Sequence, residues 1–315
     1  MKKITKNPAA SVRARLLMLA KQRDENFEFT LERYALERLL FRLSQTPNGS
    51  HFVLKGGMLL NFLSQNPYRV TRDLDLLGYG DPSAERLRLI FQEACRLDFP
   101  EEGLRFSEQI STFPIKEGKE YPGIRLKFEA CLEAARISLQ IDVGFGDAVL
   151  KPYSKVVFEP FLGFPLPDIF AYPLESVLAE KIHAMLELGK ETSRMKDIYD
   201  LLYLASNHAW SSLRLAEAVQ LTFMSRRRSL PAELPEMFTP AFFEHPQKLS
   251  QWQAFRTKLP KAALKETNLQ RILNQLELFW WPLLQALQQD RPFAFVWNPE
   301  AWSWLPEPIS AEAMR

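Results

Sequence analysis

The strongest constraint in this sequence is a change in hydrophobic periodicity near Pro173. Before it, short apolar runs of strand length alternate with helical segments and with glycine or proline turns. After it, apolar residues recur almost entirely at helical spacing. This order predicts an α+β protein, with a mixed sheet in a first domain, residues 1–165, and a helical second domain, residues 166–315.

Turn residues and periodicity divide the first domain further. A strand over residues 51–54, a glycine turn and a helix over residues 58–63 are expected in succession. The remaining elements are helices near residues 9–22, 30–45 (with Thr30 as N-cap) and 83–97, and strands at 70–77, 104–115, 123–132 and 136–145. A tight turn near Glu133 predicts that the last two strands form a hairpin.

Length and composition limit the class of protein. The chain has 315 residues, which favours two domains, and its 46% apolar and 25% charged residues are typical of a soluble globular protein. The net charge of +2 neither demands nor excludes a nucleic-acid partner. Cys95 and Cys131 are the two cysteines, so we expect no disulfide framework and no zinc site. Without an apolar segment of membrane-spanning length, the sequence predicts a cytoplasmic protein.

The segment Thr71-Arg72-Asp73-Leu74-Asp75-Leu76 carries the clearest chemical signal. On a strand, Asp73 and Asp75 point to one side and the two leucines point into a core. Neighbouring carboxylates repel each other unless a cation compensates, and Mg²⁺ or Mn²⁺ prefers such oxygen ligands. A solvated strand face with two aspartates is the alternative.

A second strand strengthens the metal hypothesis. Apolar and polar residues alternate from Ile137 to Val143, which places Asp142 on the face opposite the core. If this strand lies beside that of Asp73 and Asp75, Asp142 completes a triad able to hold divalent metal at phosphates. Otherwise, Asp142 faces water.

Lys55-Gly56-Gly57 precedes a predicted helix. Glycine permits close approach of a ligand to the backbone, and a helix N-terminus offers N–H groups to a phosphate, with Lys55 as an added charge. Ordinary turn chemistry is the alternative explanation for this pair of glycines.

Lys181 lies in the apolar stripe of a helix that Pro173 opens. Such a lysine either extends to solvent or meets a buried anion, and we expect it to reach a triphosphate between the domains. On the next helix, Asp197 is expected to flank the core and to orient Lys181, contact substrate or act as a base. A helix-capping or surface ion-pair role is the alternative for Asp197. Asp200 is expected to be more exposed, and His183 is expected on a polar face.

Two other features have open interpretations. Arg226-Arg227-Arg228 is the densest basic cluster, and it is either a solvated helix end or a grip on an RNA backbone. Five tryptophans near the C-terminus are expected to pack the last helices, with a base-stacking platform as the alternative: Trp280, Trp281, Trp297, Trp302 and Trp304.

These motifs together resemble the AbiEii/AbiGii toxin family of nucleotidyltransferases. The matching segments, in order, are LKGG (54–57), TRDLDLLG (71–78), QIDVGFGD (140–147), LAEKIHAM (178–185) and RMKDIYDL (194–201). The resemblance implies a polymerase-β-like minimal nucleotidyltransferase core followed by a helical domain. It also implies a bacterial toxin with a separately encoded antitoxin, and some relatives transfer nucleotides to the tRNA acceptor end.

Carried over residue by residue, the resemblance assigns a role to each motif. Gly56 and Gly57 would line the phosphates, and Asp73 and Asp75 would bind Mg²⁺. Lys181 would hold the triphosphate of an NTP, and Asp197 would be the catalytic carboxylate of the second domain. The family usually pairs its first glycine with serine or glycine; because this chain has Gly-Gly, no side-chain hydroxyl is offered to a phosphate.

The leading hypothesis is therefore a Mg²⁺-dependent nucleotidyltransferase toxin that acts on tRNA. The alternatives are nucleotide transfer to a small molecule or a protein, and a catalytically silent module that keeps the fold. The identity of the nucleotide and direct binding of an antitoxin are left open by the sequence.

Overall fold

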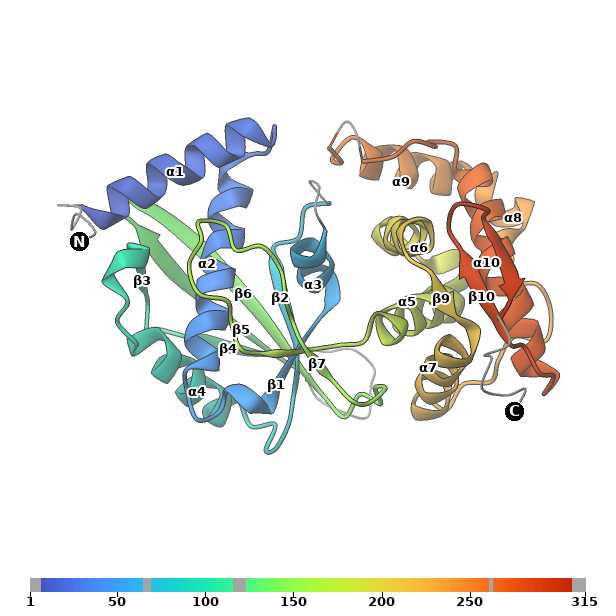
Figure 1. The fold of residues 1–315 in the computed structure, drawn as a ribbon, viewed down its shortest axis with the longest axis horizontal. Coiled ribbons are helices and arrows are strands. Elements are labelled where there is room, and N and C mark those ends of the chain that lie inside the picture. The colour runs from blue at the N-terminus through green and yellow to red at the C-terminus, as the bar shows by residue number, and fades with distance from the viewer. Residues whose placement is uncertain (1–6, 65–68, 116–122, 261–262, 308–315) are drawn as a thin grey trace, which may run out of the picture. The chain divides into compact units, whose positions relative to one another are not determined.

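A computed structural model of the chain describes residues 7–64, 69–115, 123–260 and 263–307. The basic residues Lys2, Lys3 and Lys6 lie outside the described residues. The chain divides into two compact units (Figure 1). Unit 1 comprises residues 1–147 and 152–172, and unit 2 comprises residues 148–151 and 173–315.

Unit 1 is built on one mixed sheet. Within the described residues, eight strands pair in the order β3-β5-β6-β2-β1-β8-β7, with β4 added to β5. The strands are β1 (Phe52–Lys55), β2 (Asp73–Gly78), β3 (Leu104–Phe106), β4 (Ser111–Ile115), β5 (Gly123–Leu132), β6 (Ala135–Phe145), β7 (Ser154–Lys155) and β8 (Phe170–Ala171). The central pair β2–β6 is parallel, whereas its neighbours β1–β2 and β5–β6 are antiparallel.

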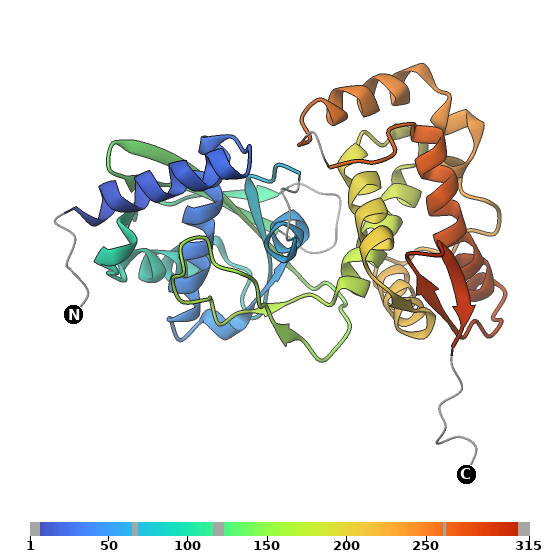
Figure 2. The ribbon, with the colours of Figure 1, turned by 45° about the horizontal axis from the view of Figure 1, so that its top comes forward.

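The helices of unit 1 are α1 (Pro8–Gln22), α2 (Phe27–Ser44), α3 (Gly56–Leu63) and α4 (Ala84–Arg96), with short 3-10 turns η1 (Gly49–His51) and η2 (Pro100–Glu102). Helix α2 packs against β6 and lies along the sheet in Figures 1 and 2. The buried side chains of β6 that form this core are Ile137, Leu139, Ile141 and Val143. Burying each such side chain contributes about 2 kcal/mol, so the apolar alternation of β6 fixes which face its polar residues occupy.

Buried charges tie α2 to η2. The Arg38 Nη1 donates to Glu102 Oε1 at 3.2 Å, and Arg42 Nη2 donates to Glu102 Oε2 at 3.1 Å. All three side chains are almost fully enclosed. Because each buried charge faces an opposite charge, this network fixes the position of α2 at moderate energetic cost.

Unit 2 is mainly helical. Its helices are α5 (Leu174–Leu188), α6 (Met195–Asn207), α7 (Ser212–Ser225), α8 (Pro240–Phe243), α9 (Pro246–Arg256) and α10 (Leu269–Gln288), with 3-10 turns η3 (Gly189–Glu191) and η4 (Glu236–Phe238). A small antiparallel sheet in the order β11-β10-β9 joins them: β9 (Trp210–Ser211), β10 (Phe295–Asn298) and β11 (Ser303–Pro306). No helix in the described part of the chain is long and apolar enough to cross a membrane.

The predicted α+β class, with a mixed sheet followed by helices, is confirmed. The hairpin at Glu133 is also confirmed, since Leu132 pairs with Ala135 and Glu133 has the positive φ of 53° that such a turn needs. The tryptophans pack the C-terminal elements as expected: Trp297 is fully buried, and Trp302 and Trp304 donate to carbonyls of α10.

Several predicted element boundaries are wrong. Thr30 is not the N-cap of α2, because Asn26 caps the helix by accepting from the Glu28 N–H at 2.8 Å. The strand expected over residues 104–115 is two strands, β3 and β4, which pair with different parts of β5. The C-terminal hairpin β10–β11 was not expected, because proline near both strands obscures the alternation.

Candidate metal and nucleotide site

The two carboxylates of β2 lie on one side of the strand, as predicted. Leu74 and Leu76 are completely buried, whereas Asp73 and Asp75 are partly exposed between and beside them. Alternation along the strand therefore separates the core-forming residues from the acidic ones.

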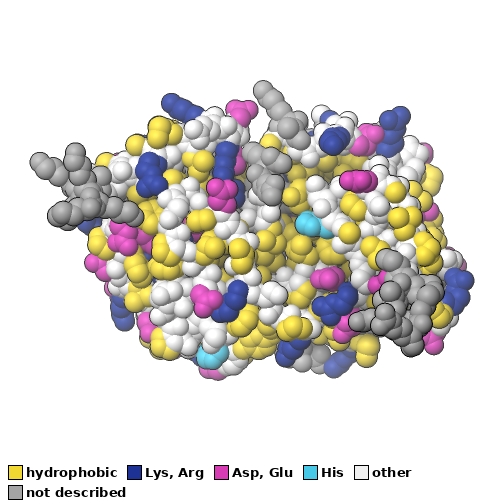
Figure 3. Space-filling model, viewed as in Figure 1, with side chains coloured by type: hydrophobic (Ala, Val, Ile, Leu, Met, Phe, Trp, Pro, Cys, Tyr) yellow, Lys and Arg dark blue, Asp and Glu magenta, His cyan; other side chains and the backbone are white. Residues whose placement is uncertain are grey.

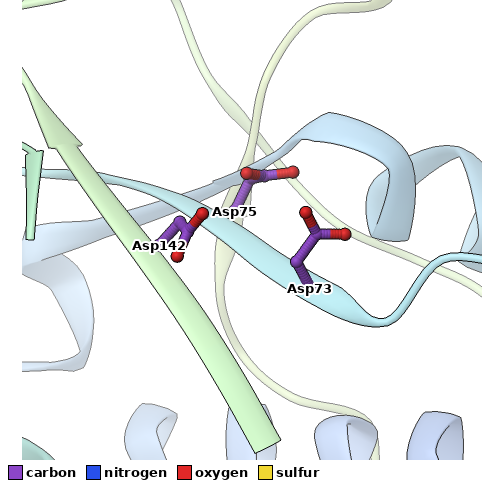
Figure 4. Close-up of side chains that lie close together, drawn as sticks. All are labelled: Asp73, Asp75 and Asp142. Atoms are coloured by element: carbon purple, nitrogen blue, oxygen red, sulfur yellow. The ribbon is translucent and has the colours of Figure 1, made fainter. Parts of the chain in front are cut away.

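Asp142 lies beside Asp75. The parallel pairing of β2 with β6 places these two residues directly opposite each other. Oxygen atoms of Asp73, Asp75 and Asp142 all lie within 4.8 Å of one another (Figure 4). Three carboxylate oxygens at this separation match the hard oxygen ligands that Mg²⁺ and Mn²⁺ prefer, so the residues present fit a divalent ion.

The register also produces a charged row across four strands. Lys55 on β1 pairs with Asp75, Asp75 pairs with Asp142, and Asp142 pairs with Arg125 on β5. Paired residues on neighbouring strands share a face of the sheet. Across the sheet from β1 to β5, the charges of the row are therefore positive, negative, negative and positive.

Arg125 was not singled out from the sequence. Its Nε donates to Asp142 Oδ1 at 2.8 Å and its Nη2 donates to Asp142 Oδ2 at 2.7 Å, so the guanidinium binds both carboxylate oxygens. Nothing in the local pattern of β5 distinguishes this arginine from a solvent-facing one. Only the pairing of β5 with β6 reveals its role.

The glycine turn fits around these side chains. Gly56 has φ of +69°, and a Cβ atom there would lie 2.0 Å from Asp75 Oδ2. A Cβ at Gly57 would lie 2.7 Å from Arg69 Nη2. Packing against the protein's own side chains therefore explains why both positions are glycine, and the predicted strand, glycine turn and helix are confirmed by β1 and α3.

Lys55 has a partner within the protein. Its ammonium forms an ion pair with Asp147, and the Tyr172 hydroxyl donates to the same carboxylate oxygen at 3.0 Å. Asp147 ends the QIDVGFGD motif and was not predicted as a site residue. The contact positions Lys55 at the end of β1; a contact of Lys55 with phosphate stays a prediction.

An open groove begins at Asp73. Its volume is about 680 Å³. From Asp73, the first residue of β2, it extends over the neighbouring residues of β6 and β5. Its lining is mostly polar side chains of both charges and neutral hydrogen-bonding groups: Glu32, Arg72, Asp73, Ser107, Gln109, Ser111, Lys127, Glu129, Ser138 and Gln140, with Phe128 and Leu139.

Unit 2 contains a buried ion cluster of its own. Lys181 on α5 contacts Asp197 Oδ1 at 2.9 Å and Asp200 Oδ2 at 2.5 Å, both on α6. Arg194 Nε contacts Asp197 Oδ2 at 2.5 Å. Lys181 therefore meets buried anions, which are this unit's own carboxylates.

The pKa of Asp197 reflects this environment. Burial acts to raise it, but the charges of Lys181 and Arg194 outweigh burial and hold the pKa below its ordinary value. Asp197 is therefore ionised throughout the neutral range.

Two predictions about this unit are wrong. Asp200 is fully buried rather than exposed, because it turns toward Lys181 one helical turn after Asp197. His183 is 1% exposed rather than on a solvated face, because Phe223 of α7 packs edge-on against its ring at 4.9 Å. A helical pattern by itself does not reveal which face a later helix covers.

Comparison with known proteins identifies the family. Residues 38–286 match the family described as "Nucleotidyl transferase AbiEii toxin, Type IV TA system". No curated protein matches the chain. The match includes Asp73, Asp75, Asp142, Asp147, Asp197 and Asp200, and AbiEii is a nucleotidyltransferase family, as predicted.

Two solved structures from Helicobacter pylori are similar at a low level. JHP933 is 14% identical, with a TM-score of 0.45 over 81% of this chain and 89% of its own. A protein described as a candidate nucleotidyltransferase is 15% identical, with a TM-score of 0.47 over 82% of this chain and 95% of its own. Similarity at this level carries no argument about activity. The family match, which spans well over half of the residues, shows that this chain belongs to the AbiEii nucleotidyl transferase toxins of type IV toxin–antitoxin systems.

Proposed function

We propose that this chain transfers a nucleotide from an NTP to an RNA 3′ end, that of tRNA in particular, with Mg²⁺ or Mn²⁺ held by Asp73, Asp75 and Asp142. The observation that carries the proposal is the approach of three carboxylates to within 4.8 Å on two neighbouring strands. Like charges at this distance repel one another, and a bound divalent ion would relieve the repulsion that remains beside the Arg125–Asp142 pair.

Asp73 and Asp75 hold the ion, and Gly56 leaves room for the Asp75 carboxylate. When bound, the ion neutralises charge on the phosphates and activates the attacking hydroxyl. Helix α3 begins at Gly56, so the N–H groups of its first turn have no acceptor within the helix and suit a phosphate. Lys55, Gly56 and Gly57 are accordingly the proposed triphosphate-binding residues.

The acceptor is proposed to enter through the groove at Asp73. In the sheet order β5-β6-β2-β1, the groove lies on the β5–β6 side of the carboxylates and the glycine turn lies on the β1 side. The NTP would then lie on the β1 side of the carboxylates and the acceptor hydroxyl on the β5–β6 side. This arrangement supports in-line attack on the α-phosphate with release of pyrophosphate.

The charge of the groove favours a nucleoside end over a phosphate chain. Arg72 and Lys127 are its cations, Glu32, Asp73 and Glu129 are its anions, and the remaining polar groups are hydroxyls and amides. Basic and acidic side chains are likewise interspersed over the described residues visible in Figure 3. A ribose and a base, which bond through neutral groups, match this lining.

Lys181 and Asp197 are proposed to take part in the same reaction, Lys181 by binding the triphosphate and Asp197 as a catalytic carboxylate. Their support is the residue pattern of the family and the direct contact between them. Because Asp197 and Asp200 already neutralise Lys181, phosphate binding by Lys181 requires that it exchange one of these partners.

The decisive experiment incubates the full chain with each α-labelled NTP, Mg²⁺ and total tRNA. We expect label on tRNA, and loss of that label in the Asp75→Asn variant. Label on protein or on a small molecule would overturn the RNA acceptor while keeping the enzyme class. Absence of both transfer and NTP binding would overturn the proposal as a whole.

The toxin role carries its own test. Type IV toxin–antitoxin membership implies an antitoxin partner, which we propose is encoded beside this chain and acts in the cytoplasm. Expression of this chain alone should stop growth, and co-expression of the neighbouring gene should restore it. Equal toxicity of the Asp75→Asn variant would separate toxicity from catalysis and contradict the proposal.

A further inference from the structure

Arg125 occupies an unusual position for a site that is proposed to hold metal. Both oxygens of Asp142 accept hydrogen bonds from its guanidinium, at 2.8 and 2.7 Å. Two-pronged pairs of this kind are among the strongest that a carboxylate makes. A divalent ion that recruits Asp142 must therefore displace or share this bond.

A second hydrogen-bond acceptor lies close to Arg125. Its side chain is 36% exposed, whereas that of Asp142 is 14% exposed. Gln140 precedes Asp142 by two residues on the same face of β6. With its amide oxygen turned toward Arg125, Gln140 accepts from Nε and Nη2 at 3.2 Å each. Arg125 thus has a neutral partner beside the charged one.

We infer that Arg125 is a built-in counter-cation that competes with divalent metal for Asp142. In the metal-free protein Arg125 binds Asp142, so that Asp73 and Asp75 are the primary metal ligands. A second ion gains Asp142 only when Arg125 releases it and keeps Gln140, which it already contacts, as its remaining partner. The inference rests on the metal site of the proposed function, and it adds a positioning residue that sets metal affinity and stoichiometry.

The reach of the Arg125 charge is consistent with this role. Its pKa is raised, above all by the hydrogen bond to Asp142, against a smaller lowering by burial and with added contributions from Asp142, Asp73 and Asp75. All three carboxylates therefore interact with this one cation, and removing it leaves their mutual repulsion to be relieved by metal.

The test measures Mn²⁺ binding to the full chain without nucleotide, using electron paramagnetic resonance to quantify free Mn²⁺. We expect Arg125→Gln to raise the Mn²⁺ affinity by about tenfold and to increase the number of bound ions. Arg125→Lys keeps the charge but loses the two-pronged bond. Its Mn²⁺ affinity should lie between those of the wild type and Arg125→Gln. Lys127→Gln is the matched control, because Lys127 lies two residues along the same face of β5 and pairs with Gln140; it should change the affinity by less than about twofold.

A double-mutant cycle isolates the contact. Asp142→Asn should change Mn²⁺ affinity little in the wild-type background, because Arg125 already holds that carboxylate. In the Arg125→Gln background, the same change should cancel the gain.

Three outcomes would overturn the inference. Unchanged or weaker Mn²⁺ binding by Arg125→Gln does so while leaving the proposed function intact. An equal loss on Asp142→Asn and Asp75→Asn in the wild-type background does so as well. Failure of wild type and every variant to bind Mn²⁺ would overturn the metal site and the proposed function together. Thermal unfolding of each variant reports whether it is folded, and the Arg125→Lys protein decides the question if Arg125→Gln is not.

Discussion

The two charged clusters of this protein differ in how their charges are compensated. The carboxylates Asp73, Asp75 and Asp142 remain partly exposed and meet within 4.8 Å, and the partly exposed Arg125 binds Asp142. Asp197 and Asp200 are completely buried, and each contacts a cation of its own unit. Carboxylates near solvent can thus lie close together, because water and salt screen part of their repulsion, whereas a buried cluster must balance its charges internally.

This contrast predicts its largest effect for Asp75→Asn. Nucleotide transfer should fall by at least about 1,000-fold, equivalent to about 4 kcal/mol of transition-state stabilisation. The free energy of unfolding should stay constant or rise slightly, because one of three repelling charges is removed. Measurements of kcat/KM and of urea unfolding check both parts.

The exposed Asp168→Asn variant is the matched control for loss of an aspartate charge. It should retain full activity. If Asp75→Asn were active, or if it unfolded the protein, Asp75 would belong with the structural class of carboxylates instead.

The second prediction concerns Asp197→Asn, which should destabilise the protein, unlike Asp75→Asn. The unfolding free energy should fall by about 3 kcal/mol, because Lys181 and Arg194 both lose a charged partner in a buried setting. All seven tryptophans lie in unit 2, from Trp210 onward, so tryptophan fluorescence during urea unfolding reports this unit specifically. A change below about 0.5 kcal/mol would show that the cluster is not structural.

A third, smaller effect is expected with pH. Because the folded-state pKa of Asp197 is below its ordinary value of 3.8, its contribution to stability is present above that value. The contribution is lost as pH falls through the lower folded-state pKa. Unfolding of unit 2, followed by tryptophan fluorescence between pH 7 and 3, should show this loss in wild type, and Asp197→Asn should show a shallower one. An equal loss of stability with falling pH in the wild type and in Asp197→Asn would contradict this role of Asp197.

The smallest effect is expected at Arg226-Arg227-Arg228. Arg226 contacts Glu180 at 3.5 Å and Arg228 contacts Glu187 at 3.4 Å, so this helix end is already paired within unit 2. Replacing all three by glutamine should change the unfolding free energy by less than about 0.5 kcal/mol. The salt dependence of RNA binding should also be unchanged; a slope lower by about 2 would instead assign three phosphate contacts to the cluster.

Much of the candidate site followed from local sequence patterns. The alternation in β2 placed Asp73 and Asp75 opposite two core leucines, and the alternation in β6 placed Asp142 on the polar face; both are confirmed. Those placements needed no knowledge of the rest of the chain, because side chains alternate along any strand. The catalytic roles of Lys181 and Asp197 stay predictions.

The partners of these residues did not follow from the sequence. Arg125, Asp147 and Arg194 each contact a predicted site residue, yet none stands out in its own segment. Asp200 and His183 were expected to be exposed and are buried. In each case the deciding contact comes from another element.

Local sequence patterns were sufficient to predict the α+β class, the faces of the central strands, the glycine turn and the family. Backbone geometry repeats every 2 residues in a strand and every 3.6 in a helix, so short segments carry that information. The strand register that aligns Lys55, Asp75, Asp142 and Arg125 became evident from the folded structure alone. Register depends on pairing between segments far apart in the chain, and a shift of one residue would have turned these side chains to the opposite face.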